Sequence, residues 1–137
     1  MSDFYQKLTQ GVLVAGCIIA AAPPAWATSF TISSGETVTA AQALVDGETG
    51  LIESGGFLNT TTTSITSGAN NTVITNNGTI NVNVDGVTVF SNGSTIINNG
   101  LIRTSGDNSV VTDFRGSGHN FTNNGTIITT GVGSEAF

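Results

Sequence analysis

The chain has 137 residues and a formal net charge of −6, because nine carboxylates are set against only three Lys and Arg residues. A chain so poor in cations has almost nothing to neutralise a phosphate backbone, which argues against nucleic acid as a partner. Composition changes at about residue 27. The single Lys, Cys, Met, Tyr and Trp and both prolines lie before this point, and Thr, Ser, Asn and Gly supply more than half of the residues after it.

Residues 1–27 have the features of a secretory signal peptide. The small-apolar run over residues 11–22 is too short to span a membrane as a helix and has the length of a signal-peptide core. Pro23-Pro24 then breaks any helix, and Ala25-Trp26-Ala27 is an A-x-A cleavage pattern. We therefore expect cleavage after Ala27 and export by the secretion machinery, through the periplasm to the cell surface or the exterior.

Cys17 offers an alternative cleavage point, because the small residues before it resemble a lipoprotein box that would leave a lipid anchor. The apolar run continues past this cysteine to Ala22, which favours a cysteine buried in the signal core. No cysteine follows residue 27. An exported mature chain would then have no disulfide and must be held together in another way.

Residues 28–137 are long enough for one domain. Val, Leu, Ile and Phe make up more than a quarter of them, which is enough to bury a core. Residues 28–50 alternate polar and apolar positions in places, as half-buried strands do, while residues 40–45 could instead form a short helical turn. We predict that residues 28–50 form an N-terminal cap, because an uncovered sheet end invites aggregation.

A short phrase recurs along the rest of the chain. It occurs as Ile74-Thr-Asn-Asn-Gly-Thr-Ile80, as Ile96-Ile-Asn-Asn-Gly-Leu-Ile102 and as Phe121-Thr-Asn-Asn-Gly-Thr-Ile127. Its glycines are 22 and then 25 residues apart, and Gly50-Leu-Ile resembles a divergent first copy. Phe90, Phe114 and Phe137 recur at a similar interval and support the same frame. Such a period is the mark of a repeat architecture.

The period and the residue types together select one kind of repeat. Helical repeats exceed about 30 residues, and leucine-rich repeats need several leucines per unit, whereas the clear units here contain only Leu101. We predict an all-β fold over residues 51–137, a right-handed parallel β-helix (solenoid) with three short strands and about 22–25 residues per coil. Ten apolar side chains are expected to point into its core: Ile80, Val82, Val84, Val87, Val89, Ile96, Ile102, Phe114, Phe121 and Ile127.

The recurring Asn-Asn-Gly would form a corner of each coil, since Gly and Asn tolerate the positive φ of a tight turn. We expect the first asparagine of each copy to stack into a hydrogen-bonded ladder and the second to mark the turn. The alternative is that Asn and Gly are simply common in turns. The predicted corner residues are Asn76, Asn77, Gly78, Asn98, Asn99, Gly100, Asn123, Asn124 and Gly125.

A leader peptide followed by a Cys-free, Thr/Asn/Gly-rich chain with recurring N-N-G-x-I and S-x-V-x-x-F words resembles the N-terminal part of a bacterial autotransporter passenger. The likeness is clearest over residues 64–137. It implies a downstream outer-membrane β-barrel, for which this chain shows no run of barrel strands. On this interpretation residues 51–137 are passenger coils truncated at Phe137, or the remnant of a degenerate gene.

Residues suited to catalysis are few. His119 is the single histidine; Asp107 and Asp113 are near it in sequence, but no G-x-S-x-G nucleophile turn exists, so we expect a solvated loop histidine. Asp85 and these two aspartates are too scattered for a metal cage, and no calcium-binding repeat occurs. The two arginines that follow residue 27 are too few for the clustered basic residues of a polysaccharide lyase.

The sequence thus leads to two hypotheses. The first is an exported cell-surface module, structural and adhesive, without catalysis, cofactor or metal, whose surface ligand is unknown. The alternative is the scaffold part of a secreted hydrolase or lyase whose active site lies beyond residue 137. The reading frame after Phe137 distinguishes them, because it encodes either a barrel alone or a catalytic insertion as well.

Overall fold

A computed structural model describes residues 28–137, and the predicted signal peptide with its cleavage residues Ala25 and Ala27 lies outside them. Within the described residues the chain is all-β, with fourteen short strands and no helix. The strands are β1 Phe30–Ile32, β2 Thr37–Val38, β3 Gln42–Leu44, β4 Thr49–Ile52, β5 Phe57–Thr60, β6 Ile65–Ser67, β7 Val73–Asn76, β8 Thr79–Val82, β9 Val87–Val89, β10 Thr95–Asn98, β11 Leu101–Thr104, β12 Thr112–Phe114, β13 Asn120–Asn123 and β14 Thr126–Thr129.

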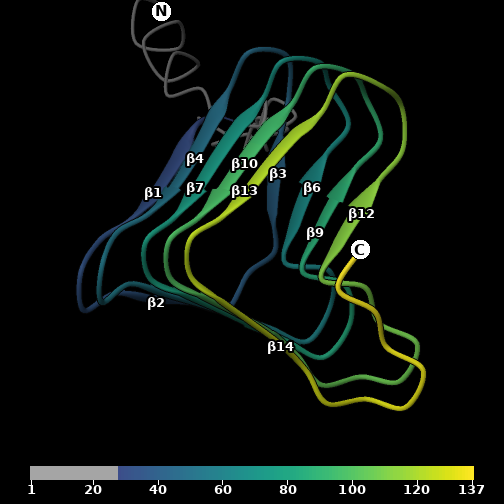
Figure 1. Ribbon diagram of the computed structural model, residues 1–137. Coiled ribbons are helices and arrows are strands. Elements are labelled where there is room, and N and C mark those ends of the chain that lie inside the picture. The colour runs from purple at the N-terminus through teal and green to yellow at the C-terminus, as the bar shows by residue number, and fades with distance from the viewer. Residues whose placement is uncertain (1–27) are drawn as a thin grey trace, which may run out of the picture.

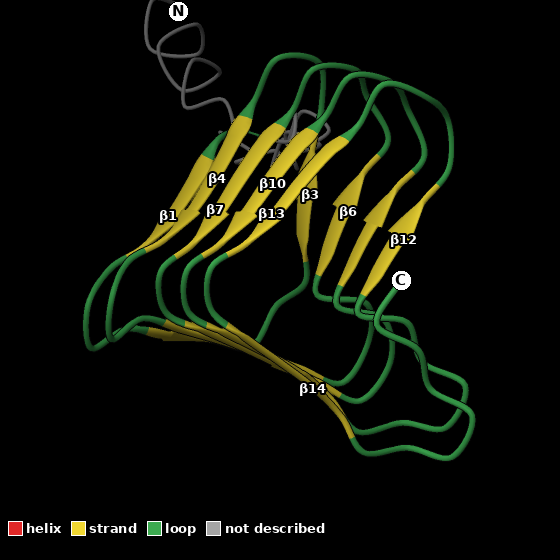
Figure 2. Ribbon diagram, in the orientation of Figure 1, coloured by secondary structure: helices red, strands yellow, loops and turns green. Residues whose placement is uncertain are grey.

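Successive strands go in turn to three sheets, so that each of the first four coils contributes one strand to each sheet and the fifth contributes β13 and β14. Sheet A has the order β1-β4-β7-β10-β13, sheet B the order β2-β5-β8-β11-β14, and sheet C the order β3-β6-β9-β12. All neighbouring strands are parallel. The three sheets enclose the interior as the three sides of a solenoid (Figures 1 and 2). The predicted parallel β-solenoid is therefore confirmed.

Residues 28–50, which we predicted to be a cap, contain β1, β2 and β3 and form the first coil of the stack. Residues 40–45 include strand β3, so the alternative of a helical turn there is wrong. The first coil is also shorter than the later ones, because Phe30 pairs with Gly50, only 20 residues further on. A period of 22 residues begins at β5, where Asn59 lies below Asn81, and becomes 25 residues from β9 to β12 onward.

The divergent first copy of the repeated phrase lies at Gly56 and not at Gly50. Gly50 pairs with Ile74 inside sheet A, where a Cβ would come within 2.6 Å of the Phe30 ring. Gly56 precedes Phe57, which pairs with Thr79, and therefore lies one coil below Gly78. The corner between β4 and β5 spans residues 53–56, whereas the corner between β7 and β8 spans only 77–78. Because the longer corner changes the spacing of the phrase, the copy at Gly56 could not be recognised from the sequence.

The core runs along the axis of the solenoid and is built mainly from Ile, Val and Leu. Six of the ten predicted core residues are buried: Ile80, Val82, Val87, Val89, Ile96 and Ile102. Phe114, Phe121 and Ile127 are partly buried and pack against this core. The prediction for Val84 is wrong, because strand β8 ends at Val82 and Val84 lies in the bend that follows, 40% exposed.

The frame drawn from the phenylalanines is also wrong, because they do not occupy equivalent positions of their coils. Phe114 pairs with Val89, and Phe90 follows Val89, so Phe90 and Phe114 are not equivalent positions. A shift of one residue along a strand moves a side chain to the opposite face of the sheet. Phe114 accordingly packs against the core, while Phe90 faces outward and is 50% exposed.

Candidate functional site

The first asparagine of each phrase belongs to a ladder inside the solenoid. Asn76 Nδ2 donates to Asn98 Oδ1 at 2.8 Å, and Asn98 Nδ2 donates to Asn123 Oδ1 at 2.7 Å. The same two nitrogens also donate to the backbone carbonyls of Leu101 and Thr126. Asn76 and Asn98 are 1% exposed or less. Because these amides are buried and hydrogen-bonded to protein, the ladder holds coils together and does not bind a ligand.

The second asparagine of each phrase forms another ladder on the outside, where the sequence indicated only a turn. Asn99 Nδ2 donates to Asn77 Oδ1 at 2.8 Å, and Asn124 Nδ2 donates to Asn99 Oδ1 at 2.9 Å. None of the nine predicted corner residues has a positive φ. The prediction that glycine is needed there for a positive φ is therefore wrong. A Cβ on Gly100 would instead collide with the backbone oxygen of Gly78. Glycine is needed for close approach of one coil to the next.

His119 is partly buried and does not behave as the solvated loop residue we predicted. Its Nδ1 accepts a hydrogen bond from the backbone N–H of Ser94 at 3.3 Å, and its ring stacks on Phe114 with centroids 5.2 Å apart. The histidine therefore fastens the fifth coil to the fourth. Both contacts, one with a backbone N–H and one with an aromatic ring, pack the histidine against its neighbours.

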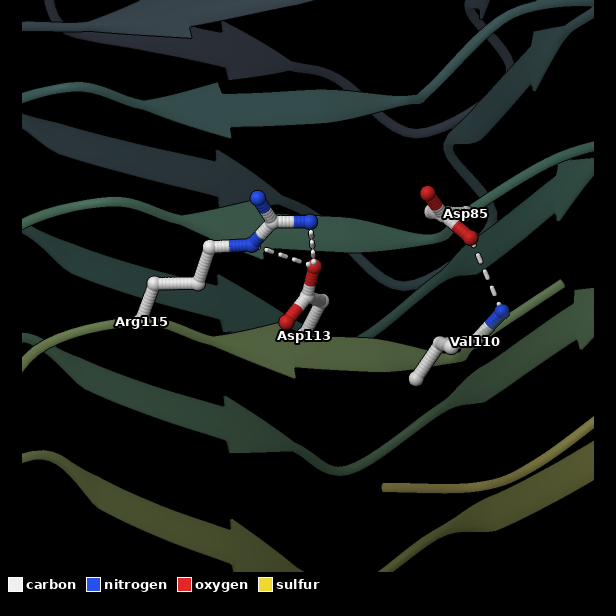
Figure 3. A network of polar contacts seen from close by, with 4 residues as sticks. All are labelled: Asp85, Val110, Asp113 and Arg115. Atoms are coloured by element: carbon white, nitrogen blue, oxygen red, sulfur yellow. Dashed lines mark hydrogen bonds and ion pairs between the residues drawn. The ribbon is translucent and has the colours of Figure 1, made fainter.

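Asp85, Asp107 and Asp113 accept hydrogen bonds from loop backbone groups or pair with an arginine. Asp85 Oδ1 accepts from the backbone N–H of Val110 at 2.8 Å, and Asp113 forms an ion pair of 2.9 Å with Arg115 (Figure 3). Asp107 accepts from a backbone N–H in the next coil. Nowhere in residues 28–137 do three His, Cys, Asp or Glu side chains gather so as to hold a metal ion.

The two arginines of the described chain have different surroundings. The guanidinium of Arg115 pairs with Asp113 and lies over the ring of Phe90, 5.1 Å from its centroid. Arg103 lies in β11 on the outer face of sheet B and is exposed. Across residues 28–137 the Arg115–Asp113 pair is the one salt bridge, so Arg103 has no carboxylate partner there. This guanidinium is free to meet a ligand.

Arg103 borders a groove of about 470 Å³ on the outer face of sheet B. The groove crosses four strands, β2, β5, β8 and β11, and its size is within the range of small-ligand sites. Its lining residues are Thr37, Phe57, Leu58, Asn59, Thr79, Asn81, Leu101 and Arg103. No carboxylate is among them. The groove therefore presents neutral polar groups, apolar surface and a single positive charge.

Strand register arranges the groove residues in two rows that run along the solenoid. Thr37, Phe57, Thr79 and Leu101 occupy one row, and Asn59, Asn81 and Arg103 the next. The Phe57 side chain is 46% exposed, and Asn81 Nδ2 donates to Asn59 Oδ1 at 2.9 Å. Except for Thr37 on the edge strand β2, these side chains lie on strands that are paired on both sides. The set combines neutral polar side chains, apolar side chains and one guanidinium.

Sequence reasoning did not identify the groove, because its rows appear only when the coils are stacked in register. A signal was present: the pairs Phe57/Asn59, Thr79/Asn81 and Leu101/Arg103 each occupy alternate positions of one strand and recur every 22 residues. Without the position of Gly56, the first of these pairs could not be aligned with the others.

No helix in residues 28–137 combines the length and the apolar character needed to cross a bilayer. Comparison of the chain with protein-family models, with curated proteins and with solved structures found no match, so its function must be argued from its own residues and geometry.

Proposed function

We propose that this chain is an exported, non-catalytic surface module that presents the outer face of sheet B for binding. One observation carries the proposal: a groove on that face that lacks carboxylates and contains Arg103, the described arginine with no acidic partner. Strands β5, β8 and β11 pair with a neighbour on each side, so the groove side chains are held before any ligand arrives. Such preorganisation favours binding.

The proposal includes export and membership of a larger surface protein of the autotransporter type. The leader-like residues 1–27, the absence of cysteine after them and the resemblance of the repeated words support it. A parallel solenoid held by ladders and an apolar core also suits display without disulfides. The secretion machinery and a downstream outer-membrane barrel would be its partners.

Export is tested by expressing the full chain in a Gram-negative host and measuring the mass of the product in each compartment. We expect a periplasmic or external product that begins at Thr28, and accumulation of the precursor when Ala27→Leu spoils the A-x-A pattern. A product that begins at an acylated Cys17 would show a lipoprotein instead. An uncleaved chain confined to the cytoplasm would contradict export.

The binding face is tested with a printed array of neutral and anionic oligosaccharides and short peptides, probed with the full chain. Phe57→Thr should reduce binding, and this variant suits the fold because Thr37 and Thr79 occupy the same row. Val132→Thr is the control, since Val132 is 79% exposed and does not line the groove. If both variants bind as the unmodified chain does, sheet B is not the binding face.

A further inference from the structure

We infer that the groove on sheet B takes a short oligosaccharide that carries carboxylate groups, of the uronate type. This inference rests on the proposed function, because it names the ligand class of the same face. Three features of the groove point to this chemistry: a free guanidinium, a pair of amides in a fixed orientation and an exposed aromatic ring.

The charge of the ligand follows from Arg103. A guanidinium offers five N–H donors in a planar fork, which matches a carboxylate by two parallel hydrogen bonds. The chain as a whole is acidic, with a net charge of −6, and repels anions in general. The groove contains no carboxylate of its own, so the positive charge of Arg103 attracts an anionic ligand there. Arg115 cannot serve in the same way, because Asp113 neutralises it.

The row formed by Asn59 and Asn81 indicates that the ligand carries hydroxyl groups. The hydrogen bond between Asn81 and Asn59 fixes both amides, and Asn59 Nδ2 donates to no atom of residues 28–137. Amides and threonine hydroxyls both donate and accept, as sugar hydroxyls do. The side chains of Thr37 and Thr79 line the groove beside them. These groups suit a ligand with many hydroxyls.

The row that contains Phe57 indicates that the ligand has an apolar face, as a sugar ring does. Phe57 is 46% exposed and lies one coil from Thr79, with Leu101 a coil beyond. An exposed aromatic ring offers a large flat apolar surface at little entropic cost. Successive coils are about 4.8 Å apart, so a chain of sugar rings lying along the solenoid would pass from this ring to Arg103.

An acidic peptide would carry the same charge, but the groove suits it less well. Peptides that bind to sheets usually add a strand at a free edge, where backbone groups are unpaired. Strands β5, β8 and β11 have a neighbour on each side, and only β2, which contributes Thr37 at one end of the groove, has a free edge. Over the three inner strands, the backbone of a peptide would have to find its partners among side chains alone.

The test is isothermal titration of the full chain with trigalacturonate and with its fully methyl-esterified form, which differs in the carboxylate charges. We expect binding of the acid that weakens with added salt, and at least tenfold weaker binding of the ester. Arg103→Asn should weaken binding of the acid by about ten- to a hundredfold, the effect of losing a charged hydrogen-bond pair. This variant suits the fold, because it continues the row of Asn59 and Asn81.

Arg115→Gln is the matched control, since it removes the same charge outside the groove and should leave the affinity unchanged. Circular dichroism of each variant checks that the solenoid is intact. Equal binding of acid and ester, no binding of the acid, or an Arg103→Asn variant that binds normally would overturn the inference. If a neutral oligosaccharide or a pentaglutamate peptide binds instead and is lost in Phe57→Thr, the ligand class is wrong while sheet B remains the binding face.

Discussion

Gly78, Gly100 and Gly125 are glycines because successive coils pass very close at this corner. A Cβ on any of them would collide with the backbone oxygen of the glycine one coil below, Gly56 in the case of Gly78. Their φ angles are negative, so conformational freedom is not the reason. The sequence shows that glycine recurs at this position, but the clash that requires it comes from a coil more than 20 residues away.

Gly100→Ala should therefore lower the free energy of unfolding by about 1–3 kcal/mol, the usual cost of forcing atoms into filled space. Gly68→Ala is the control, since its Cβ would meet nothing within 4 Å and its φ is not positive. We expect it to change stability by less than about 0.5 kcal/mol. Urea unfolding followed by circular dichroism measures both, and an equal loss in the two variants would contradict the close-approach explanation.

The two asparagines of one phrase differ in how deeply their hydrogen bonds are buried. Asn98 is fully buried and bonded to the coil below and the coil above, whereas Asn99 makes its ladder bonds in contact with water. Asn98→Ala should cost about 2–4 kcal/mol, because it removes the buried hydrogen bond from Asn76 and the part-buried bonds to Asn123 and Thr126, and leaves each of these groups without that partner. Asn99→Ala should cost less than about 1 kcal/mol. The same urea titration compares them, and similar losses would mean that burial does not set the strength of the ladder.

At the scale of a strand, alternation of side chains predicts which residues face the core only while the strand lasts. Strand β8 alternates until Val82, and the chain then bends toward β9. Val84 continues the alternation in the sequence but not in space. In the same way, Phe90 lies just past the end of β9 and faces outward. Residues at strand ends are therefore where pattern reasoning failed.

Val82 and Val84 provide a matched pair for this point. Val82→Ala should lower the unfolding free energy by about 1.5–3 kcal/mol, since it removes buried apolar surface and leaves a cavity. Val84→Ala should change it by less than about 0.5 kcal/mol, because the side chain is 40% exposed. Thermal or urea unfolding measures the stability of both variants. A larger loss of stability in Val84→Ala than in Val82→Ala would contradict the assignment of Val84 to the surface.

At the scale of the molecule, each coil packs on its neighbours, so differences in coil length are absorbed at corners. The connection from β8 to β9 covers residues 83–86, and the connection from β11 to β12 covers 105–111. The strands on either side keep their register despite the added residues, which bulge outward at the lower right of Figure 1. This explains why the sequence period changes from 22 to 25 without a change of fold.

A solenoid of this kind should tolerate removal of a whole coil but not of a partial one. Deletion of residues 77–98 removes one period of 22, because Asn98 lies directly above Asn76. We expect the product to keep a β-type circular dichroism spectrum and a cooperative, weaker unfolding transition. Deleting one residue more, 77–99, should abolish cooperative unfolding, since a shift of one residue turns inward side chains outward. Cooperative unfolding of both deletions would contradict stacking in register.

Local chemistry was enough to predict an all-β solenoid, its period and the asparagine position at its corner, because repeated words and alternating apolar residues are properties of the chain itself. Only the tertiary structure decided which glycine begins the series, which valines are covered and why glycine stands at the corner. Each of these depends on atoms in the neighbouring coil. The groove on sheet B belongs to the second group, because Phe57, Asn81 and Arg103 come from three different coils and line one groove only when the coils are stacked in register.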